Sequence, residues 1–249
     1  MRRILESSTE LGVVHRLLRR LPPDEAERLG RRLRRLSRPA RLGTLRRTSP
    51  VSDDFGYDRG TPIDRYYIER FLSEQRRHIR GHVLEVKDHD YTDRFGTGVT
   101  KRDVLDIDPV NSVATIVADL SAAEGIPDAT FDCFILTQTL QFIYHTHAAL
   151  THAHRILRPG GALLATVPAV SPVVDDGELT DYWRFTPASC AGVFGDVFGR
   201  ESIRIRAYGN VLTAIAFLAG MAREELTARE LDAYDSRFSI LICVYAGKK

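Results

Sequence analysis

From residue 82 onward, short apolar runs bounded by turn residues alternate with segments of helical periodicity. The clearest runs, 131–137 and 162–167, are apolar at nearly every position, as expected of strands covered on both faces of a sheet. The segment between them is long enough for a crossover helix that ends at Pro159, so the pair predicts a parallel βαβ unit. Further strands are expected at 82–86, 104–107, 115–118, 202–207 and 238–245.

Helical segments are predicted among these strands and before them. They cover residues 62–80, 137–144, 147–157, 187–198, 210–222 and 224–234. Thr186 followed by Pro187 is typical of a helix cap and first turn. The alternation predicts an α/β fold, a Rossmann-like seven-stranded mostly parallel sheet with helices on both faces, preceded by an N-terminal helical arm. We expect the α/β domain to occupy residues 61–249, and residues 1–60 to form a basic arm and linker.

The arm carries a charge opposite to that of the rest of the chain. Residues 1–50 hold 14 of the 35 Lys and Arg residues but only 5 of the 33 Asp and Glu residues. Leucine spacing predicts one helix over 11–21 and a second after Asp24. Such an arm suits self-association, or contact with an anionic surface or acceptor. Nucleic acid is disfavoured as a partner, because residues 1–50 contain no Phe, Trp or Tyr for base stacking.

Composition narrows the cellular setting. The three cysteines, Cys133, Cys190 and Cys243, are widely spaced and two of them lie in strand-like runs, which favours buried free thiols over disulfides or a metal site. The chain has neither an apolar run long enough to span a membrane nor a secretory leader at Met1. These observations predict a cytoplasmic protein.

Acidic and polar side chains follow successive predicted strands. Glu85 ends the first, Asp106 and Asp108 the second, Asp119 the third, and Thr137 with Gln138 the fourth. Open α/β sheets bind ligands at the carboxyl ends of their strands. A carboxylate about 20 residues beyond the first strand suits a ribose, because it accepts from both hydroxyls. The pattern therefore predicts a cofactor that contains a nucleoside.

The arrangement resembles the class I S-adenosylmethionine-dependent methyltransferases, in particular the methyltransferase type 11 group. The resemblance covers about residues 80–190. It is carried by Val83-Leu84-Glu85-Val86, Leu105-Asp106-Ile107-Asp108-Pro109, Val117-Ala118-Asp119-Leu120, the run from Phe131 to Leu140, Ile156-Leu157-Arg158-Pro159-Gly160-Gly161, and Asp181-Tyr182-Trp183-Arg184-Phe185-Thr186-Pro187.

This resemblance implies S-adenosyl-L-methionine as the cofactor. Glu85 corresponds to the strand-end acid of the family, Asp106 or Asp108 to its ribose partner, and Asp119 to the residue that faces the adenine amino group. Thr137 and Gln138 fall where the family lines the cofactor pocket. One departure concerns the first turn, where the family has Gly-x-Gly-x-Gly. Here the turn reads Lys87-Asp88-His89-Asp90-Tyr91, so its side chains either fill the methionyl pocket or leave Lys87 to meet the cofactor carboxylate.

The acceptor side of the site is expected in three segments. His145, Asp175 and Asp176 are the candidate general bases, and Trp183, Arg184 and Tyr57 are the candidates for shaping the acceptor pocket. The histidines at 145, 147, 152 and 154 lack a partnering acid in register, so no metal site is predicted.

The primary hypothesis is a methyltransferase that acts on an oxygen of a small-molecule or glycan acceptor. A methyltransferase-like fold that binds a partner through its basic arm, without methyl transfer, is the alternative. A nucleotide-dependent oxidoreductase is a third option, weakened by the missing phosphate-binding glycines.

Overall fold

A computed structural model describes residues 21–37, 43–174, 177 and 179–249. The chain divides into two compact units at Thr48, and each is described by itself. In the first unit the helix predicted after Asp24 is confirmed as α2 (Pro23–Ser37), with Asp24 in its first turn. The helix predicted over 11–21 lies outside the described residues, apart from Leu21.

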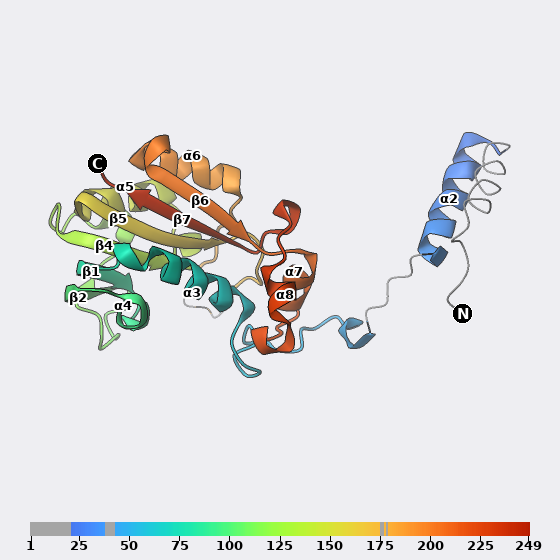
Figure 1. The fold of residues 1–249 in the computed structure, drawn as a ribbon, viewed down its shortest axis with the longest axis horizontal. Helices are drawn as coiled ribbons and strands as arrows, with labels where there is room; N and C mark the ends of the chain where they lie inside the picture. Colours follow the sequence, from blue (N-terminus) through green and yellow to red (C-terminus); the bar gives the residue numbers. More distant parts are fainter. Residues whose placement is uncertain (1–20, 38–42, 175–176, 178) are drawn as a thin grey trace. The chain divides into compact units, whose positions relative to one another are not determined.

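The second unit, from Ser49 onward, is built on one seven-stranded sheet (Figure 1). Its order is β3-β2-β1-β4-β5-β7-β6, with β7 antiparallel to both of its neighbours and the other described pairs parallel. The strands are β1 (Gly81–Val86), β2 (Val99–Asp106), β3 (Ile116–Val117), β4 (Phe131–Thr137), β5 (Leu157–Pro168), β6 (Ile203–Tyr208) and β7 (Leu241–Gly247). The predicted fold class is confirmed.

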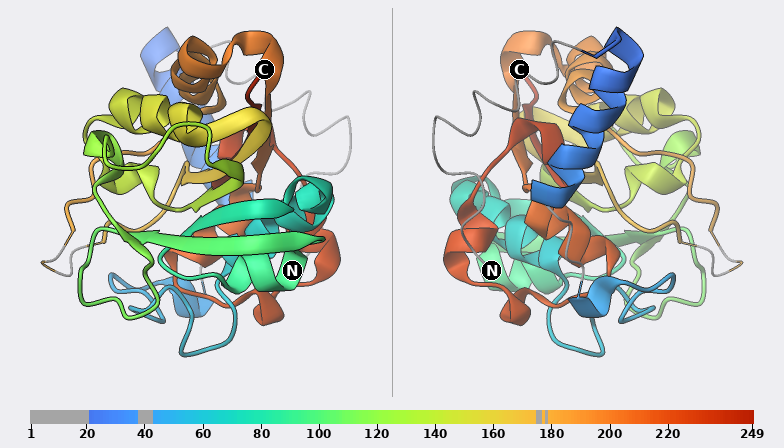
Figure 2. Two further views of the ribbon diagram at one scale, coloured as in Figure 1. Left: turned by 90° about the vertical axis from the view of Figure 1, so that its left-hand side faces the viewer. Right: turned by 90° about the vertical axis from the view of Figure 1, so that its right-hand side faces the viewer.

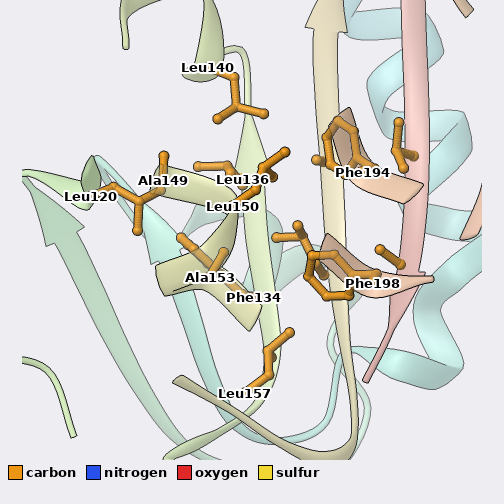
Figure 3. Packing of buried hydrophobic residues seen from close by; sticks show 14 of the residues in the cluster. Leu120, Phe134, Leu136, Leu140, Ala149, Leu150, Ala153, Leu157, Phe194 and Phe198 are labelled. Atoms are coloured by element: carbon orange, nitrogen blue, oxygen red, sulfur yellow. The ribbon is translucent and has the colours of Figure 1, made fainter. Parts of the chain in front are cut away.

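Helices cover both faces of the sheet (Figure 2). On one face, α5 (Thr146–Ile156) and α6 (Pro187–Phe198) bury a continuous apolar cluster against β4 and β5, in which Phe134, Leu150 and Phe194 are fully buried (Figure 3). Removing so much apolar surface from water is the main force that holds the layers together.

The opposite face is covered by a second set of helices. They are α3 (Ile63–Gln75), α4 (Asp90–Phe95), α7 (Val211–Leu218) and α8 (Ala228–Asp232). Helix α3 contributes large buried side chains to this second cluster, Tyr67 and Phe71 among them, and packs against α4, α7, β5 and β7. The chain turns from the end of α3 directly into β1, so the first turn of α3 lies at the carboxyl edge of the sheet (Figure 1).

Several local predictions are confirmed. Thr186 caps α6, where its hydroxyl accepts from the Ser189 backbone amide, and Pro187 opens the helix. All three cysteines are free and buried. Burial is the first cause of the raised pKa of each thiol.

Other predictions need correction. The helix predicted at 137–144 is only a 3₁₀ turn, Leu140–Phe142, because Gln138 adopts a left-handed conformation with φ 47° that ends the strand abruptly. The predicted strand 162–167 begins earlier, at Leu157, with the Pro159 to Gly161 turn forming an irregularity inside β5. The predicted helices at 62–80, 210–222 and 224–234 are shorter in the structure, and α4 was not predicted.

Candidate functional site

The strand order reverses its direction at β1. Strand β1 lies between β2 and β4, so the chain first builds outward through β2 and β3 and then returns to build β4 and β5 on the other side. The carboxyl ends of β1 and β4 therefore flank the switch point at which doubly wound sheets bind ligands. The predicted site residues between Glu85 and Gln138 follow the four strands that meet there.

Glu85 is turned inward, toward helix α4. Its side chain accepts from the backbone amides of Tyr91 and Thr92 at 3.1 and 2.8 Å, and from the Thr92 hydroxyl at 2.6 Å. Only 2% of the residue is exposed. Burial raises the pKa of Glu85 to about 7, although the hydrogen bonds from Thr92 and Tyr91 favour its charged form. Glu85 thus anchors the first turn of α4 and positions the loop between β1 and α4.

Lys87 follows β1 and has the left-handed backbone conformation that glycine adopts most easily. Its φ is 74°, and its backbone amide donates to the Leu105 carbonyl at 2.9 Å, which ties the turn to β2. The Lys87 side chain is exposed. Tyr91, the bulkiest residue of the loop, packs on the apolar cluster around α3, beside Phe95. A left-handed lysine is strained, and such strain is concentrated at functional sites.

The end of β2 carries Asp106, an acid that is hydrogen-bonded to two neighbouring residues. Asn111 donates from Nδ2 to Asp106 Oδ2 at 2.6 Å and to the Lys87 carbonyl at 2.7 Å. Asp106 Oδ1 accepts from the Asp108 amide at 3.1 Å. Asp108 is exposed and accepts from the Val110 amide at 2.8 Å, within its own turn. Asp106 is therefore the carboxylate that is held against the β1 loop, whereas Asp108 shapes the following turn.

Asp119 lies after β3 and caps the short turn Leu120–Ala122. One carboxylate oxygen accepts from both the amide and the hydroxyl of Ser121, at 2.7 and 2.8 Å. Its other oxygen, Oδ2, has no hydrogen-bond partner within the described part of the chain. Asp119 thus combines the capping role with an acceptor left over for a ligand.

Thr137 and Gln138 end β4 in the middle of the edge. The Gln138 amide donates to the Thr166 carbonyl at 2.9 Å, which fixes the left-handed residue against β5. Gln141 lies one turn later and donates from Nε2 to the Gln138 carbonyl at 2.9 Å. Gln141 is 6% exposed, and its Oε1 has no partner among the described residues. Buried polar atoms without partners are rare and point to a missing water or ligand.

An exposed aromatic cluster adjoins this end of β4. The Tyr144 ring lies 5.3 Å from that of Tyr182 and 5.8 Å from that of Trp183, measured between centroids. Trp183 Nε1 donates to the Ile143 carbonyl at 3.1 Å, and the amides of Tyr182 and Trp183 both donate to the Gln141 carbonyl. His145 precedes α5, with its ring edge-on to Tyr144 at 5.1 Å. Two loops, after β4 and β5, thus converge here.

Arg184 clamps the loop after β5. Its guanidinium binds both oxygens of Asp181, at 2.5 and 2.8 Å, and donates to the Pro172 carbonyl at 2.7 Å. Burial acts to raise the pKa of Asp181, but the hydrogen bonds from Arg184 and the Val174 amide outweigh it and leave that pKa lowered. The charge of Arg184 is therefore neutralised within its own loop.

Tyr57 lies on the opposite rim, near the first turn of α3. Its hydroxyl accepts from Arg65 Nε at 2.9 Å. The segment around Tyr57 is bonded to the residues that precede α8. Arg59 forms an ion pair with Glu225 at 2.6 Å, and the Thr61 amide donates to Glu224 at 2.9 Å. Tyr57 and Trp183 therefore come from segments far apart in sequence.

Some predicted residues and sites lie elsewhere. Asp175 and Asp176 are outside the described residues. Within the described part of the chain no group of three or more His, Cys, Asp or Glu side chains is arranged to hold a metal ion. A cavity of about 300 Å³ between α3, α8 and the end of β6 includes none of the predicted site residues. No described helix is both long and apolar enough to cross a membrane.

Sequence reasoning missed three residues of this edge: Asn111, Gln141 and Tyr144. Asn111 and Gln141 act through side-chain hydrogen bonds to the backbone of other turns, which no local pattern encodes. Tyr144 had a signal, because it directly precedes His145, a predicted site residue.

Comparison with known proteins agrees with this architecture. Residues 73–165 match the model of a family described as a methyltransferase domain. No curated protein matches the chain. Among solved structures, a Listeria monocytogenes protein assigned as an S-adenosylmethionine dependent methyltransferase has a TM-score of 0.50 at 11% identity, over 75% of this chain and 97% of that one.

Two further solved structures are similar at comparable distance. A SAM dependent methyltransferase of Archaeoglobus fulgidus has a TM-score of 0.49 at 12% identity, over 74% of this chain and 94% of that one. An S-adenosylmethionine dependent methyltransferase of Mesorhizobium loti has a TM-score of 0.47 at 14% identity, over 75% and 98%. With the family match, the strand order confirms the resemblance that the sequence predicts: the α/β body has the class I S-adenosylmethionine-dependent methyltransferase fold.

Proposed function

We propose that this chain, whose residues 73–165 match a methyltransferase domain, is an S-adenosylmethionine-dependent methyltransferase that methylates an oxygen of a small-molecule or glycan acceptor. The observation that carries the proposal is the coupling of Asp106 to the Lys87 turn through Asn111, at 2.6 and 2.7 Å. It brings a carboxylate and a tight backbone turn together at the switch point of the sheet.

The donor set of this edge fits an adenosyl group. A carboxylate has about four acceptor positions, and hydrogen bonds from described residues occupy only two on Asp106. The remaining positions suit the two hydroxyls of a ribose. The free Oδ2 of Asp119 suits the amino group of an adenine. The exposed Lys87 side chain offers a positive charge for a carboxylate. Glu85 supports the loop from within.

The chain would have to position an acceptor and receive its proton. When bound, S-adenosylmethionine would supply an electrophilic methyl group for the acceptor oxygen and would leave as S-adenosylhomocysteine. Of the three candidate bases, His145 is the one that lies among the described residues. It would take the proton of the acceptor hydroxyl, since an imidazole side chain can act as a general base near neutral pH. Its place beside Tyr144, after β4, supports this role. Holding the acceptor in line supplies further acceleration.

Calorimetric titration of the full chain with S-adenosylhomocysteine tests the proposal. We expect binding that Asp106→Asn weakens strongly and that Val110→Ala, an 83% exposed neighbour, leaves unchanged. Failure to bind, with an intact melting transition, would instead support the methyltransferase-like binding protein. Binding of a nicotinamide dinucleotide in its place would support an oxidoreductase.

A further inference from the structure

Three exposed rings stand together beside the proposed methyl-transfer centre. Tyr144, Tyr182 and Trp183, here called the aromatic platform, are 58%, 46% and 38% exposed. Large aromatic side chains usually bury most of their surface, and a group of exposed ones marks an interaction site. The platform is held in place by backbone, because Trp183 Nε1 donates to Ile143 and the Tyr182 amide donates to Gln141. Its rings are therefore presented in a fixed arrangement.

The described segments that carry the platform bear few formal charges. In the fully described segments 138–147 and 181–186, the formally charged residues are Asp181 and Arg184, and these neutralise each other through two hydrogen bonds. No unpaired Lys, Arg, Asp or Glu in these segments is left to bind an ionic ligand. The remaining polar groups of these segments include the amides of Gln138 and Gln141 and the imidazole of His145, whose ring lies 5.1 Å from that of Tyr144.

Gln141, whose backbone carbonyl accepts from the amides of Tyr182 and Trp183, carries a buried hydrogen-bond acceptor in its side chain. Gln141 Nε2 donates to the Gln138 carbonyl, which fixes the orientation of the amide and leaves Oε1 without a partner in the described chain. Burying such an atom costs free energy unless a donor reaches it. A purely apolar ring stacked on the platform would not satisfy this oxygen, whereas a ligand with hydroxyl groups would.

We propose that the aromatic platform binds a neutral carbohydrate, the C–H face of one sugar ring packing on Tyr144, Tyr182 and Trp183 and its hydroxyl rim meeting Gln138 and Gln141. A pyranose combines an apolar face with a rim of hydroxyls, and it carries no charge. The inference rests on the proposed function and deepens it, because it makes a glycan the methyl acceptor. The bound sugar ring would lie next to His145, whose ring contacts that of Tyr144.

Trp183 is the single tryptophan of the chain, so intrinsic tryptophan fluorescence reports on this site alone. The full chain, with and without S-adenosylhomocysteine, is titrated with neutral oligosaccharides of glucose, mannose and galactose, with p-cresol, and with glucuronic acid. We expect a saturable change for at least one neutral oligosaccharide. Tyr144→Ala should weaken that binding about tenfold. Gln141→Met, which removes the free acceptor, should also weaken it.

Tyr234→Ala is the matched control, because Tyr234 is also 58% exposed but lines the separate cavity near α8. A response to p-cresol or glucuronic acid but to no neutral sugar overturns the inference, as does a chain that responds to none of the probes. Equal effects of Tyr144→Ala and Tyr234→Ala also overturn it. Calorimetry with S-adenosylhomocysteine separates the two proposals: cofactor binding without sugar binding contradicts only the carbohydrate, and sugar binding without cofactor binding contradicts only the methyltransferase.

Discussion

Asn111 donates its side-chain amide to the carboxylate of Asp106 at 2.6 Å, and so fixes the acid that we assign to the cofactor ribose. The same nitrogen reaches the carbonyl of the Lys87 turn at 2.7 Å. Two turns from neighbouring strands are thereby locked to each other at the switch point, without any glycine in the first of them.

We expect Asn111→Ala to weaken S-adenosylhomocysteine binding about tenfold, because a lost hydrogen bond to a charged group is worth roughly 1.5–3 kcal/mol and water replaces part of it. The melting temperature should change little, since Asn111 lies in a partly exposed turn. Calorimetric titration checks the affinity, and Val110→Ala serves as the control. Unchanged affinity would show that the Asn111 contact does not organise the site.

Asp106 and Asp108 should differ in their effect. Asp106→Asn is expected to lower cofactor affinity by roughly 10- to 100-fold, as one or two hydrogen bonds to a carboxylate are weakened. Asp108→Asn should change it several-fold at most, because Asp108 only caps its own turn. Paired titrations of the two variants measure the difference. A larger effect of Asp108→Asn would reverse the assignment.

The raised pKa of Glu85 predicts how the free energy of unfolding depends on pH. Its pKa is raised to about 7 in the folded chain from an ordinary value of 4.5, so the folded state holds the proton more tightly than the unfolded state. The resulting stabilisation is complete below about pH 4.5 and is lost as the pH rises toward 7. The loss is on the order of 3 kcal/mol.

Glu85→Gln removes this titration while it keeps an oxygen for the amides of α4. Denaturant unfolding of both proteins between pH 5 and 8 should show wild type losing stability relative to the variant as the pH rises. If the difference between the two proteins is the same at pH 5 and pH 8, the pKa of Glu85 is not raised.

Arg184→Ala should destabilise the chain by about 3 kcal/mol, because it leaves the buried carboxylate of Asp181 unpaired. The exposed pair of Arg237 and Asp235 supplies the control, and Arg237→Ala is expected to leave the free energy of unfolding nearly unchanged. Denaturant unfolding of both variants provides the measurement. Similar costs for the two would mean that Arg184 does not hold the loop after β5.

His145→Ala should lower the methyl-transfer rate by roughly 10²- to 10⁴-fold, the usual contribution of a general base. S-adenosylhomocysteine binding should stay at the wild-type level, since His145 lies on the acceptor side. Rate measurements with the acceptor found by the sugar titrations, combined with calorimetry, check this. A variant that retains the full rate would exclude His145 as the base.

Periodicity predicted the sheet well but failed at the ends of strands. The apolar runs placed β1, β4 and β5 because a strand buried on both faces must be apolar throughout. The helix expected at 137–144 did not form, since the left-handed Gln138 and its bond to Thr166 redirect the chain. The role of Glu85 in cofactor binding stays a prediction, and the structure adds that its carboxylate accepts from the amides of α4, a helix that the sequence pattern did not reveal.

By itself the sequence determined the alternation of strands and helices, the acids at the strand ends and the opposite charge of the arm, because burial and turn chemistry act on neighbouring residues. Only the tertiary structure decided that β7 runs antiparallel between β5 and β6, that Asp106 rather than Asp108 is locked to the first turn, and that Tyr144 joins Trp183. These choices depend on contacts between residues far apart in the chain, whose hydrogen bonds and packing form only once the sheet has brought the loops to one edge.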